Sequence, residues 1–377
     1  MKVLLLSAYA ARSHVHWQNS LQTMFPQWQW CVLSLPPRHF SWRVRGNALY
    51  WSMSERKTLE DTYDLLIATS MVDLATLRGL VPSLCRIPSA LYFHENQFDY
   101  PQRRHQHSLV EAQLTSMYSA LAANCLLFNS QFNRTSFMEG CTQLLRKLPD
   151  YVPRAIVPML QAKSQVLPVP LDLPKVQLTQ PYWPGVIRVD STHPLRLLWV
   201  GRFEHDKGAE GLLRILHLLE GRGLAYELAL TGQRFRESPQ VFNQIQSAFA
   251  HRIVHCGYIE SFSQYVALMR GADLVLSTAL HEFQGVAVLE AAAQGCVPVV
   301  PDRLVYPEIY PDRLRYESNL QDVEREARSA AELILAISQN YSHYQTQIPD
   351  CSGFLLHNLA PTYERILLSL ARSQDSQ

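Results

Sequence analysis

The sequence lacks several features that would assign it to a special class of protein. Its 7 cysteines include no Cys-x-x-Cys pair, and scattered single cysteines support neither a disulfide framework nor a zinc site. No apolar run approaches the roughly 18 residues that a membrane-spanning helix needs. The first apolar run covers only Val3–Leu6, which is shorter than the core of a signal peptide. No repeat or low-complexity tract is evident. These absences predict a soluble globular protein in a reducing cytoplasm.

Length and charge give the first positive information. A chain of 377 residues with 47% hydrophobic and 18% charged residues is long enough for two domains with separate cores. The net charge of +1 is unevenly distributed. Residues 1–173 carry 16 Lys/Arg and 11 Asp/Glu, whereas residues 174–377 carry 18 and 22, so the halves are +5 and −4. The positive half either has an ordinary solvated surface or faces a polyanion.

Short apolar runs alternate with longer amphipathic stretches in both halves, which predicts βαβ architecture. The expected buried parallel strands are KVLLLSAY, YDLLIATS, SALYFHE and CLLFNS in the first half, and LRLLWVG, YELALTG, RIVHCGY, ADLVLST and PVVP in the second. Helices are expected around residues 108–123 and 210–223. The sequence thus predicts an α/β protein with two doubly wound Rossmann-like domains.

Prolines mark the expected boundary between the two domains. Six of them fall between Leu167 and Pro194, where they disfavour both a helix and a central strand. The predicted organisation is a first domain over 1–173, a Pro-rich linker over 174–194 and a second domain over 195–355. The remaining residues, 356–377, are predicted to form a C-terminal helix that packs back on the first domain.

Ligands of open α/β sheets bind beyond the carboxyl ends of the strands, so the residues that follow each strand are the first candidates for binding. Gly201 and Arg202 follow the strand LRLLWV, and Lys207 comes five residues after Arg202. An arginine and a lysine on one strand-to-helix loop suit a diphosphate, the arginine as a planar fork and the lysine as a point charge. The alternative is that both are surface cations.

The stretch HEFQGVAVLE contains a second pair of charges, Glu282 and Glu290, with seven residues between them. Glu282 is expected in a loop and Glu290 about two turns into the following helix. Carboxylates suit sugar hydroxyls because they offer several acceptor lone pairs and no competing donor. The free amides at the start of that helix would form an anion site.

These motifs together resemble a known group of enzymes. GRFEHDKG, LTG and HEFQGVAVLEAAAQGCVPVVP are similar to the donor-binding domain of retaining glycosyltransferases of the glycogen-synthase-like superfamily, which have the GT-B fold of two domains facing across a cleft. In the first half, SAYAARSHVHW, RHFSWRVRG, YFHENQFDYP and FNSQFNR resemble the narrower family of tRNA-queuosine mannosyltransferases. One departure is Arg12, which stands in the first loop where a glycine is expected.

The resemblance implies a reaction and roles for individual residues. Mannose would be transferred from GDP-mannose to the queuosine base of a tRNA, without a metal or other cofactor. Arg202 and Lys207 would bind the donor diphosphate, Glu282 the transferred sugar and Glu290 the ribose. His94 would contact the donor sugar. Further donor contacts would come from Gly201 and from the backbone of Phe283, Gln284, Gly285 and Val286. Because configuration is retained, the diphosphate itself can take the acceptor's proton, and no general base is assigned.

The acceptor is expected to bind to the positive first domain. Residues at predicted strand ends and in basic segments that also carry an aromatic suit an RNA surface, through phosphate contacts and base stacking. The candidates are Ser13, His14, Trp42, Arg43, Glu95, Asn96, Arg103, Arg104, Asn129 and Ser130. Two alternatives stay open: a GT-B enzyme that uses another nucleotide sugar and a glycan, lipid or small-molecule acceptor, and a catalytically silent binding module.

Overall fold

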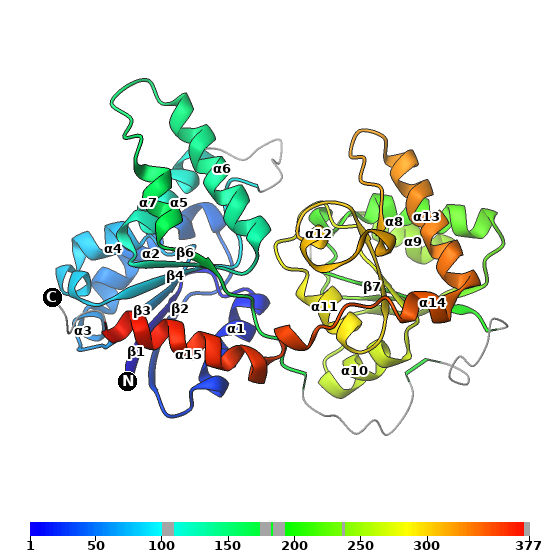
Figure 1. Cartoon of the computed structure of the whole chain (residues 1–377), viewed down its shortest axis with the longest axis horizontal. Coiled ribbons are helices and arrows are strands. Elements are labelled where there is room, and N and C mark those ends of the chain that lie inside the picture. Colours follow the sequence, from blue (N-terminus) through cyan, green and yellow to red (C-terminus); the bar gives the residue numbers. More distant parts are fainter. Residues whose placement is uncertain (100–108, 174–181, 184–192, 236–237, 373–377) are drawn as a thin grey trace. The chain divides into compact units, whose positions relative to one another are not determined.

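The computed structural model describes residues 1–99, 109–173, 182–183, 193–235 and 238–372 (Figure 1). The chain forms two compact units, the first made of residues 1–172 and 354–377 and the second of residues 173–353. Arg103 and Arg104 lie outside the described residues, as does most of the predicted linker. Within that linker Trp183 is described, and its buried indole donates a hydrogen bond to the carbonyl of Leu268 in the second unit.

The first unit is built on a six-stranded parallel sheet with the order β2-β1-β3-β4-β5-β6. Its strands are β1 Lys2–Ser7, β2 Gln29–Ser34, β3 Leu65–Thr69, β4 Ser89–Phe93, β5 Cys125–Phe128 and β6 Ser164–Val166. The central strands are apolar along their whole length because helices cover both faces, as the sequence predicted. All strands are parallel, but β2 is added on one side of β1 and β3 on the other, so the direction in which strands are added reverses at β1.

Two groups of helices cover this sheet (Figure 1). One comprises α1 Arg12–Met24 and α15 Leu356–Arg372, which contact each other, while α15 also contacts β3 and β4. The other comprises α2 Phe40–Ser54, α4 Leu74–Leu80, α5 Leu109–Ala122, α6 Gln131–Lys147 and α7 Ile156–Ala162, with the short α3 Arg56–Leu59 after α2. Alternate residues of a strand point to opposite faces of the sheet and pack against different helix groups. Leu4 and Leu6, for example, lie in one core cluster with Val44 of α2 and Leu77 of α4.

The second unit repeats the plan with the sheet order β12-β11-β10-β7-β8-β9, again all parallel. The strands are β7 Leu195–Val200, β8 Tyr226–Thr231, β9 Ile253–Gly257, β10 Leu274–Leu276, β11 Val297–Pro301 and β12 Arg315–Tyr316. The helices are α8 Ala209–Gly221, α9 Val241–Ala248, α10 Phe262–Gly271, α11 Val286–Ala293, α12 Tyr306–Ile309, α13 Val323–Gln339 and α14 Tyr341–Gln345. The two predicted doubly wound sheets are therefore confirmed. None of the helices in the described part of the chain has the length and apolarity needed to cross a bilayer.

Strand order determines where a ligand can enter each sheet. In the second unit β7 lies between β8 and β10, so the loops after β7 and β10 leave in opposite directions and open a crevice between them. The loop after β7 carries Arg202 and Lys207, and the loop after β10 carries Glu282. Three of the four charged residues predicted to bind the donor, Arg202, Lys207 and Glu282, thus lie in loops at this one switch point, whereas Glu290 lies within α11.

Candidate functional site

The loop after β7 is packed tightly against the end of β10. Gly208 adopts a left-handed conformation with φ +66°, and a Cβ there would lie 1.9 Å from the carbonyl oxygen of Thr278. The hydroxyl of Thr278 donates to the carbonyl of Lys207 at 2.8 Å and accepts from the indole of Trp199 at 3.1 Å. A glycine at position 208 is therefore required for the loop to reach β10 and to place Lys207 beside it.

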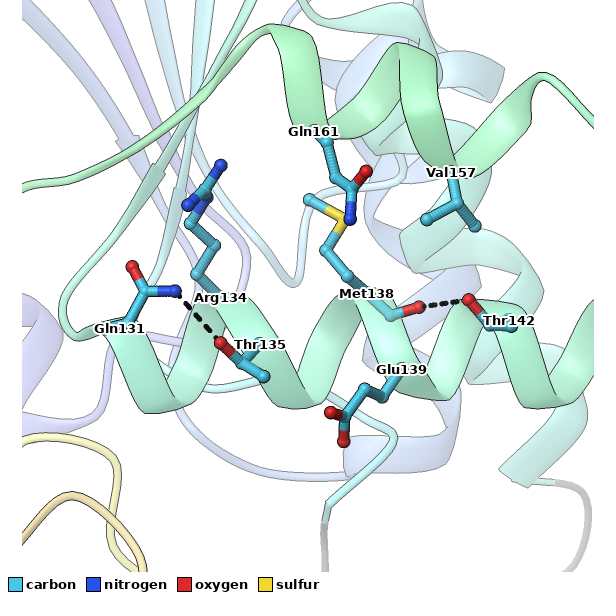
Figure 2. Close-up of a pocket in the computed structure, with 8 residues that line it drawn as sticks. All are labelled: Gln131, Arg134, Thr135, Met138, Glu139, Thr142, Val157 and Gln161. Atoms are coloured by element: carbon cyan, nitrogen blue, oxygen red, sulfur yellow. Dashed lines mark hydrogen bonds between the residues drawn. The ribbon is translucent and has the colours of Figure 1, made fainter. Parts of the chain in front are cut away.

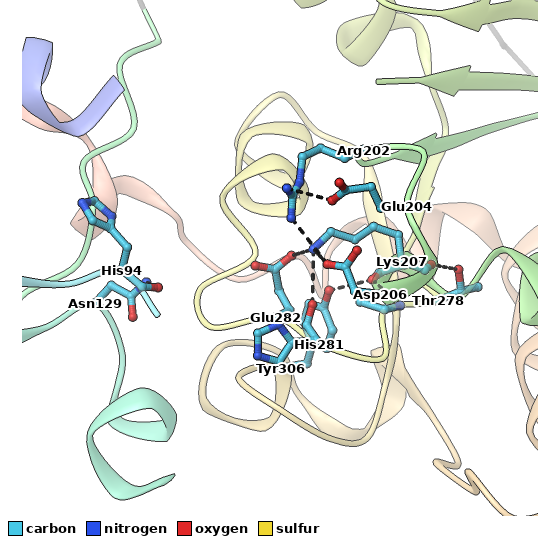
Figure 3. A network of polar contacts seen from close by, with 12 residues as sticks. His94, Asn129, Arg202, Glu204, Asp206, Lys207, Thr278, His281, Glu282 and Tyr306 are labelled. Carbon is cyan, nitrogen blue, oxygen red and sulfur yellow. Dashed lines mark hydrogen bonds and ion pairs between the residues drawn. The ribbon is translucent and has the colours of Figure 1, made fainter. Parts of the chain in front are cut away.

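Lys207 is the centre of a polar network (Figure 3). Its Nζ lies 2.9 Å from Glu282 Oε2 and 3.5 Å from Asp206 Oδ2, and it donates to the carbonyl of His281 at 3.2 Å. Burial opposes the ammonium, but Glu282 and Asp206 outweigh it and leave the pKa of Lys207 raised. Burial likewise opposes the Glu282 carboxylate, but Lys207 and the Gly285 amide leave the pKa of Glu282 lowered. Both side chains are charged at neutral pH.

Arg202 extends the network toward solvent. Its guanidinium contacts Glu204 at 2.8 Å and Asp206 at 3.6 Å, and 44% of its side chain is exposed. Asp206 therefore stands between the two cations, a role that was not predicted. The position of Asp206, four residues after Arg202 and next to Lys207, was the available signal. Three carboxylates hold Arg202 and Lys207 in place before any ligand binds.

The segment from Ser277 to Glu282 is held by hydrogen bonds from Tyr306, Tyr316 and Arg303, three residues that the sequence did not point to. The Tyr306 and Ser277 hydroxyls share a hydrogen bond of 2.6 Å, and the Tyr316 hydroxyl donates to the Ser277 carbonyl at 2.8 Å. Arg303 donates twice to the carbonyl of Ala279, from Nε at 3.1 Å and from Nη2 at 2.9 Å. Its Nη1 donates to Glu326 Oε2 at 2.6 Å. These contacts fix the backbone that carries Glu282.

The backbone amides of Leu280 and His281 donate to the carbonyl of Asp206, at 2.9 and 3.2 Å. The loops after β7 and β10 are thus tied directly to each other. His281 is buried against Phe283, with ring centroids 4.6 Å apart, and its pKa is lowered to about 4 because burial and then Lys207 disfavour the imidazolium. The loop pair behaves as one rigid support for the charges.

Helix α11 follows this loop, with Gly285 at its N-cap at φ +69°. The side chains of Phe283 and Gln284 are buried, and the backbone contacts that the resemblance implied for them remain a prediction. Glu290 is the fifth residue of α11, just over one turn from its start at Val286, so the predicted depth of about two turns was wrong. Its Oε2 accepts a hydrogen bond of 3.0 Å from the hydroxyl of Tyr265 on α10.

In the first unit, His94 follows β4 as predicted and stacks on His14. Their ring centroids are 4.1 Å apart with an interplanar angle of 19°, and Trp17 meets His94 edge-on at 5.0 Å. Burial, followed by His14 and His16, holds the pKa of His94 well below its usual value. Its Nε2 is buried and has no hydrogen-bond partner in the part of the chain that the structure describes. A buried, neutral imidazole with an unused nitrogen is a suitable contact for a sugar hydroxyl.

Several predicted acceptor residues have structural tasks instead of open positions. Ser13 and His14 lie in the first turn of α1 and not at a strand end, because β1 stops at Ser7. Ser130 caps α6 by accepting from the Asn133 amide at 3.0 Å. Asn96 is fully buried and donates to the side chains of Asn133 and Ser136, at 2.9 and 2.8 Å.

The remaining first-unit candidates lie at strand ends and in the first turn of α2. Asn129 donates to the carbonyl of His94 at 2.9 Å and so positions that residue (Figure 3). Glu95 is half-buried, and its carbonyl accepts from the Ser70 hydroxyl at 3.1 Å. Arg12 begins α1, and no residue from 8 to 12 has a positive φ, so the backbone there does not need a glycine for its conformation. Trp42 and Arg43 lie in the first turn of α2.

An open hollow of about 220 Å³ lies elsewhere in the first unit, between α6 and α7 (Figure 2). Its lining consists of Gln131, Arg134, Thr135, Met138, Glu139, Thr142, Val157 and Gln161, none of which belongs to the predicted site. Arg134 is already engaged with the Ser164 hydroxyl at 2.7 Å. The hollow offers no set of charges comparable to that around Lys207, and we assign it no function.

Solved structures share the architecture of the whole chain. Sucrose-phosphate synthase from Thermosynechococcus elongatus has a TM-score of 0.67 at 14% identity, covering 99% of this chain and 100% of that one. Anabaena HepE in complex with UDP has a TM-score of 0.66 at 15% identity, covering 98% and 100%. At these identities the likeness concerns the fold alone. Together with the two six-stranded parallel sheets, it confirms the predicted GT-B fold.

Sequence relatives identify the family. A family model for glycosyl transferases group 1 matches residues 194–340, and one for the tRNA-queuosine alpha-mannosyltransferase N-terminal region matches residues 2–171. A glycogen synthase of Mycobacterium tuberculosis is 30% identical over 126 residues, which is 32% of this chain and 29% of that protein. A Drosophila melanogaster tRNA-queuosine alpha-mannosyltransferase is 35% identical over 289 residues, which is 76% of each chain. On this identity and coverage, the chain belongs to the tRNA-queuosine alpha-mannosyltransferase family.

Proposed function

We propose that this protein transfers mannose from GDP-mannose to the queuosine base of a tRNA with retention of configuration. Membership of the family supports the reaction and the acceptor, and the network around Lys207 supports a nucleotide-sugar donor. The single observation that carries most weight is the convergence of Arg202, Lys207 and Glu282 at the switch point of a parallel sheet. A tRNA acceptor would place the enzyme in the cytoplasm.

In this proposal the diphosphate is held by the two cations after β7. Arg202 is exposed enough to grip phosphate oxygens, and Lys207 is charged because Glu282 and Asp206 stabilise its ammonium. Positive charge at this position stabilises the negative charge that develops on the departing GDP. Two cations supply the charge that a divalent metal would otherwise provide, so transfer is proposed to need no metal or other cofactor.

The carboxylates would bind hydroxyl groups. Glu282 is charged and partly exposed, with 26% of its side chain accessible, so one oxygen can accept from the sugar while the other holds Lys207. Glu290 would accept from the ribose, and the Tyr265 hydroxyl orients it by occupying Oε2. His94 would contact the transferred sugar through its neutral ring.

The proposed step breaks the bond between the anomeric carbon and the diphosphate oxygen. A bond from the same carbon to the acceptor hydroxyl oxygen forms on the same face, and the hydroxyl proton passes to a diphosphate oxygen. Because the leaving group takes the proton, no residue of the chain is required as a nucleophile or general base. The two glutamates therefore do not act as the paired carboxylates of a glycoside hydrolase.

The two other functions that the sequence left open predict different behaviour. A catalytically silent module would have no reason to keep a partly buried Lys207–Glu282 pair, because taking charges out of water is costly unless they serve a ligand or a specific structure. A GT-B enzyme with a glycan, lipid or small-molecule acceptor would keep the donor site and ignore tRNA. Both alternatives are separated from the main proposal by one assay.

The assay incubates the protein with GDP-mannose and bulk tRNA that contains or lacks queuosine, and then determines nucleoside masses. A hexose added only to queuosine is the expected result. UDP- and ADP-sugars tested in parallel report donor choice. Arg202→Ala with Lys207→Ala should abolish transfer, whereas Arg214→Ala, which removes an exposed pair with Glu324 and a hydrogen bond to the Glu210 carbonyl, is the matched control. Donor turnover without tRNA modification would favour another acceptor, and no nucleotide binding at all would favour the silent module.

A further inference from the structure

The indole of Trp42 is held flat on the surface of α2. A Cβ placed on Gly46, one turn further along the helix, would lie 2.4 to 2.7 Å from three bonded neighbours of the ring, Cε2, Cδ2 and Cζ2. Near-equal distances to three adjacent ring atoms mean that the ring turns its face, and not its edge, toward Gly46. Any side chain at position 46 would displace the ring.

Glycine inside a helix costs about 1 kcal/mol relative to alanine, so its presence at position 46 calls for a reason. Gly46 is buried under the indole, while Trp42 itself is 57% exposed. One face of the ring therefore rests on the helix and the rest is open to solvent. An aromatic that is fixed on one side and bare on the other is prepared to stack on a flat partner with little loss of conformational freedom.

The basic residues around Trp42 differ in how they are engaged. Arg45 is neutralised by Asp73 at 2.6 Å and Glu111 at 3.6 Å. Arg38 and Arg43 form no ion pair with any residue that the structure describes. The Nε of Arg43 is moreover buried without a hydrogen-bond partner among those residues. Two cations without an ion pair to any described residue thus lie within four residues of Trp42 in the sequence, in the unit whose sequence carries the excess of positive charge.

This surface lies at the carboxyl edge of the first sheet, where His94 also lies. Phe40, the first residue of α2, meets Tyr9 edge-on with ring centroids 6.0 Å apart. Tyr9 belongs to the loop after β1, and the amide of Ala10 donates to the carbonyl of Leu35 at 2.9 Å. The loops that follow β1 and β2 are therefore joined, and they fix the start of α2 relative to the sheet.

We propose that Trp42 is a stacking platform for an unstacked base of the acceptor RNA, with Arg38 and Arg43 binding the adjacent phosphates. The inference rests on the proposed function and assigns this surface to tRNA recognition. Aromatic faces bind single-stranded bases largely irrespective of sequence, and arginines supply the salt-dependent part of the affinity. A second copy of the chain is the competing occupant, because Leu49, Tyr50 and Met53 continue an exposed apolar row along the same face of α2.

The test measures tRNA binding and GDP-mannose binding for matched variants. Trp42→Ala should weaken tRNA binding about 5- to 150-fold, which corresponds to one lost base stack, and Trp42→Phe should recover part of the loss. Gly46→Ala, which keeps Trp42 in the sequence but displaces its indole from the helix surface, should also weaken tRNA binding. Arg38→Ala with Arg43→Ala should lower the salt slope of tRNA binding by about 1 to 2. GDP-mannose binding should not change in any of these variants.

Met53→Ala is the control, because Met53 is 67% exposed on the same face of α2 but lies three turns away from Trp42. It should leave tRNA binding unchanged. If wild-type protein binds tRNA and Trp42→Ala binds it equally well, the platform is disproved while the proposed function stands. If the wild type binds no tRNA at low salt, the proposed acceptor fails and the platform with it. Self-association that both Trp42→Ala and Met53→Ala reduce, with tRNA binding intact, would assign the surface to a second copy.

Discussion

Single residues of the proposed donor site would combine structural and functional tasks, and the Lys207–Glu282 pair is the clearest case. The two side chains are 15% and 26% exposed, so water screens their interaction only partly. A charge left behind by its partner in such a position is more costly than the intact pair is stabilising. Removing either residue therefore affects folding as well as binding, and a loss of activity in one variant is not by itself proof of a role in transfer.

A double-mutant comparison separates the two tasks. Glu282→Gln should lower the free energy of unfolding by about 1 to 3 kcal/mol, because Lys207 keeps only Asp206 at 3.5 Å as a charged partner. Glu282→Gln should also weaken GDP-mannose binding. Adding Lys207→Met should recover part of the stability but none of the GDP-mannose binding. Urea unfolding and calorimetric titration measure the two effects. The exposed pair Arg214–Glu324 provides the control, and its double variant should cost less than about 1 kcal/mol.

His281 gives the stability of the second unit a predictable pH dependence. Its pKa in the folded protein, about 4, lies below the ordinary value near 6.5, so between these pH values the unfolded chain binds more protons. The stability contributed by neutral His281 is complete above pH 6.5 and is lost as the pH falls. Between pH 7.5 and 5.0 this residue should lower the free energy of unfolding by about 2 kcal/mol.

Urea unfolding at these two pH values tests the expectation. His281→Gln should show a smaller decrease between pH 7.5 and 5.0 than the wild type, by about 2 kcal/mol. The exposed His251, changed to Gln, serves as the control because it lies at the surface beside Glu220. Equal decreases in the wild type and His281→Gln would show that His281 takes up a proton without unfolding.

At the scale of elements, the strands were predictable because they are buried on both faces. Runs such as Leu65–Thr69 and Val297–Pro301 are apolar along their length, and parallel strands covered by helices require that pattern. The predicted strand list omitted Gln29–Ser34, which is an edge strand of mixed polarity, and the very short β6 and β12. Edge strands bury less surface, so their sequences carry a weaker signal.

The residues proposed to bind the donor were easier to find in the sequence than those that support them. Arg202, Lys207 and Glu282 follow strands within recognisable motifs. Tyr306, Tyr316 and Arg303 reach the Ser277–Glu282 segment only because β11 and β12 lie beside β10 in the sheet. A carboxylate such as Asp206 looks like an ordinary surface charge until the fold shows which cations it touches. Supporting contacts depend on tertiary packing, which local sequence does not encode.

Helix α15 illustrates such a supporting contact across a long sequence separation. The Tyr363 hydroxyl accepts from the Trp17 indole at 3.0 Å and donates to the Pro168 carbonyl at 2.8 Å. Trp17 in turn stacks on Tyr92 at 4.1 Å and meets His94 edge-on. The last helix of the chain thereby fixes the aromatic layer against which His94 rests.

Tyr363→Phe should lower the stability of the first unit by about 1 to 3 kcal/mol, because the Trp17 N–H stays buried and loses its acceptor. We also expect a lower kcat with little change in KM for GDP-mannose, since His94 would be held less firmly. Thermal unfolding and steady-state kinetics measure both. Tyr151→Phe, at a side chain that is 97% exposed, should change neither. Unaltered stability in Tyr363→Phe would mean that water satisfies the indole.

At the scale of the whole molecule, the two units have separate sheets and separate cores. The donor charges lie entirely in the second unit, whereas His94 and the Trp42 surface lie in the first. Each ligand should therefore stabilise mainly the unit that holds most of its contacts. Hydrogen exchange resolves this because it reports opening free energies along the chain.

GDP-mannose at ~100 times its Kd should stabilise the unit that binds it by about 2.7 kcal/mol, which slows exchange through its global opening about 100-fold. We expect this slowing in β7 and β8 and in the loops 201–208 and 277–285, with a much smaller effect in β1 and β3. A tRNA should instead protect the start of α2. The double variant Arg202→Ala with Lys207→Ala controls for nonspecific effects of the nucleotide. Equal slowing of β1 and β7 by GDP-mannose would show that the two units open together. Hydrogen exchange could then not support the assignment of the donor to the second unit, which would rest on the point variants alone.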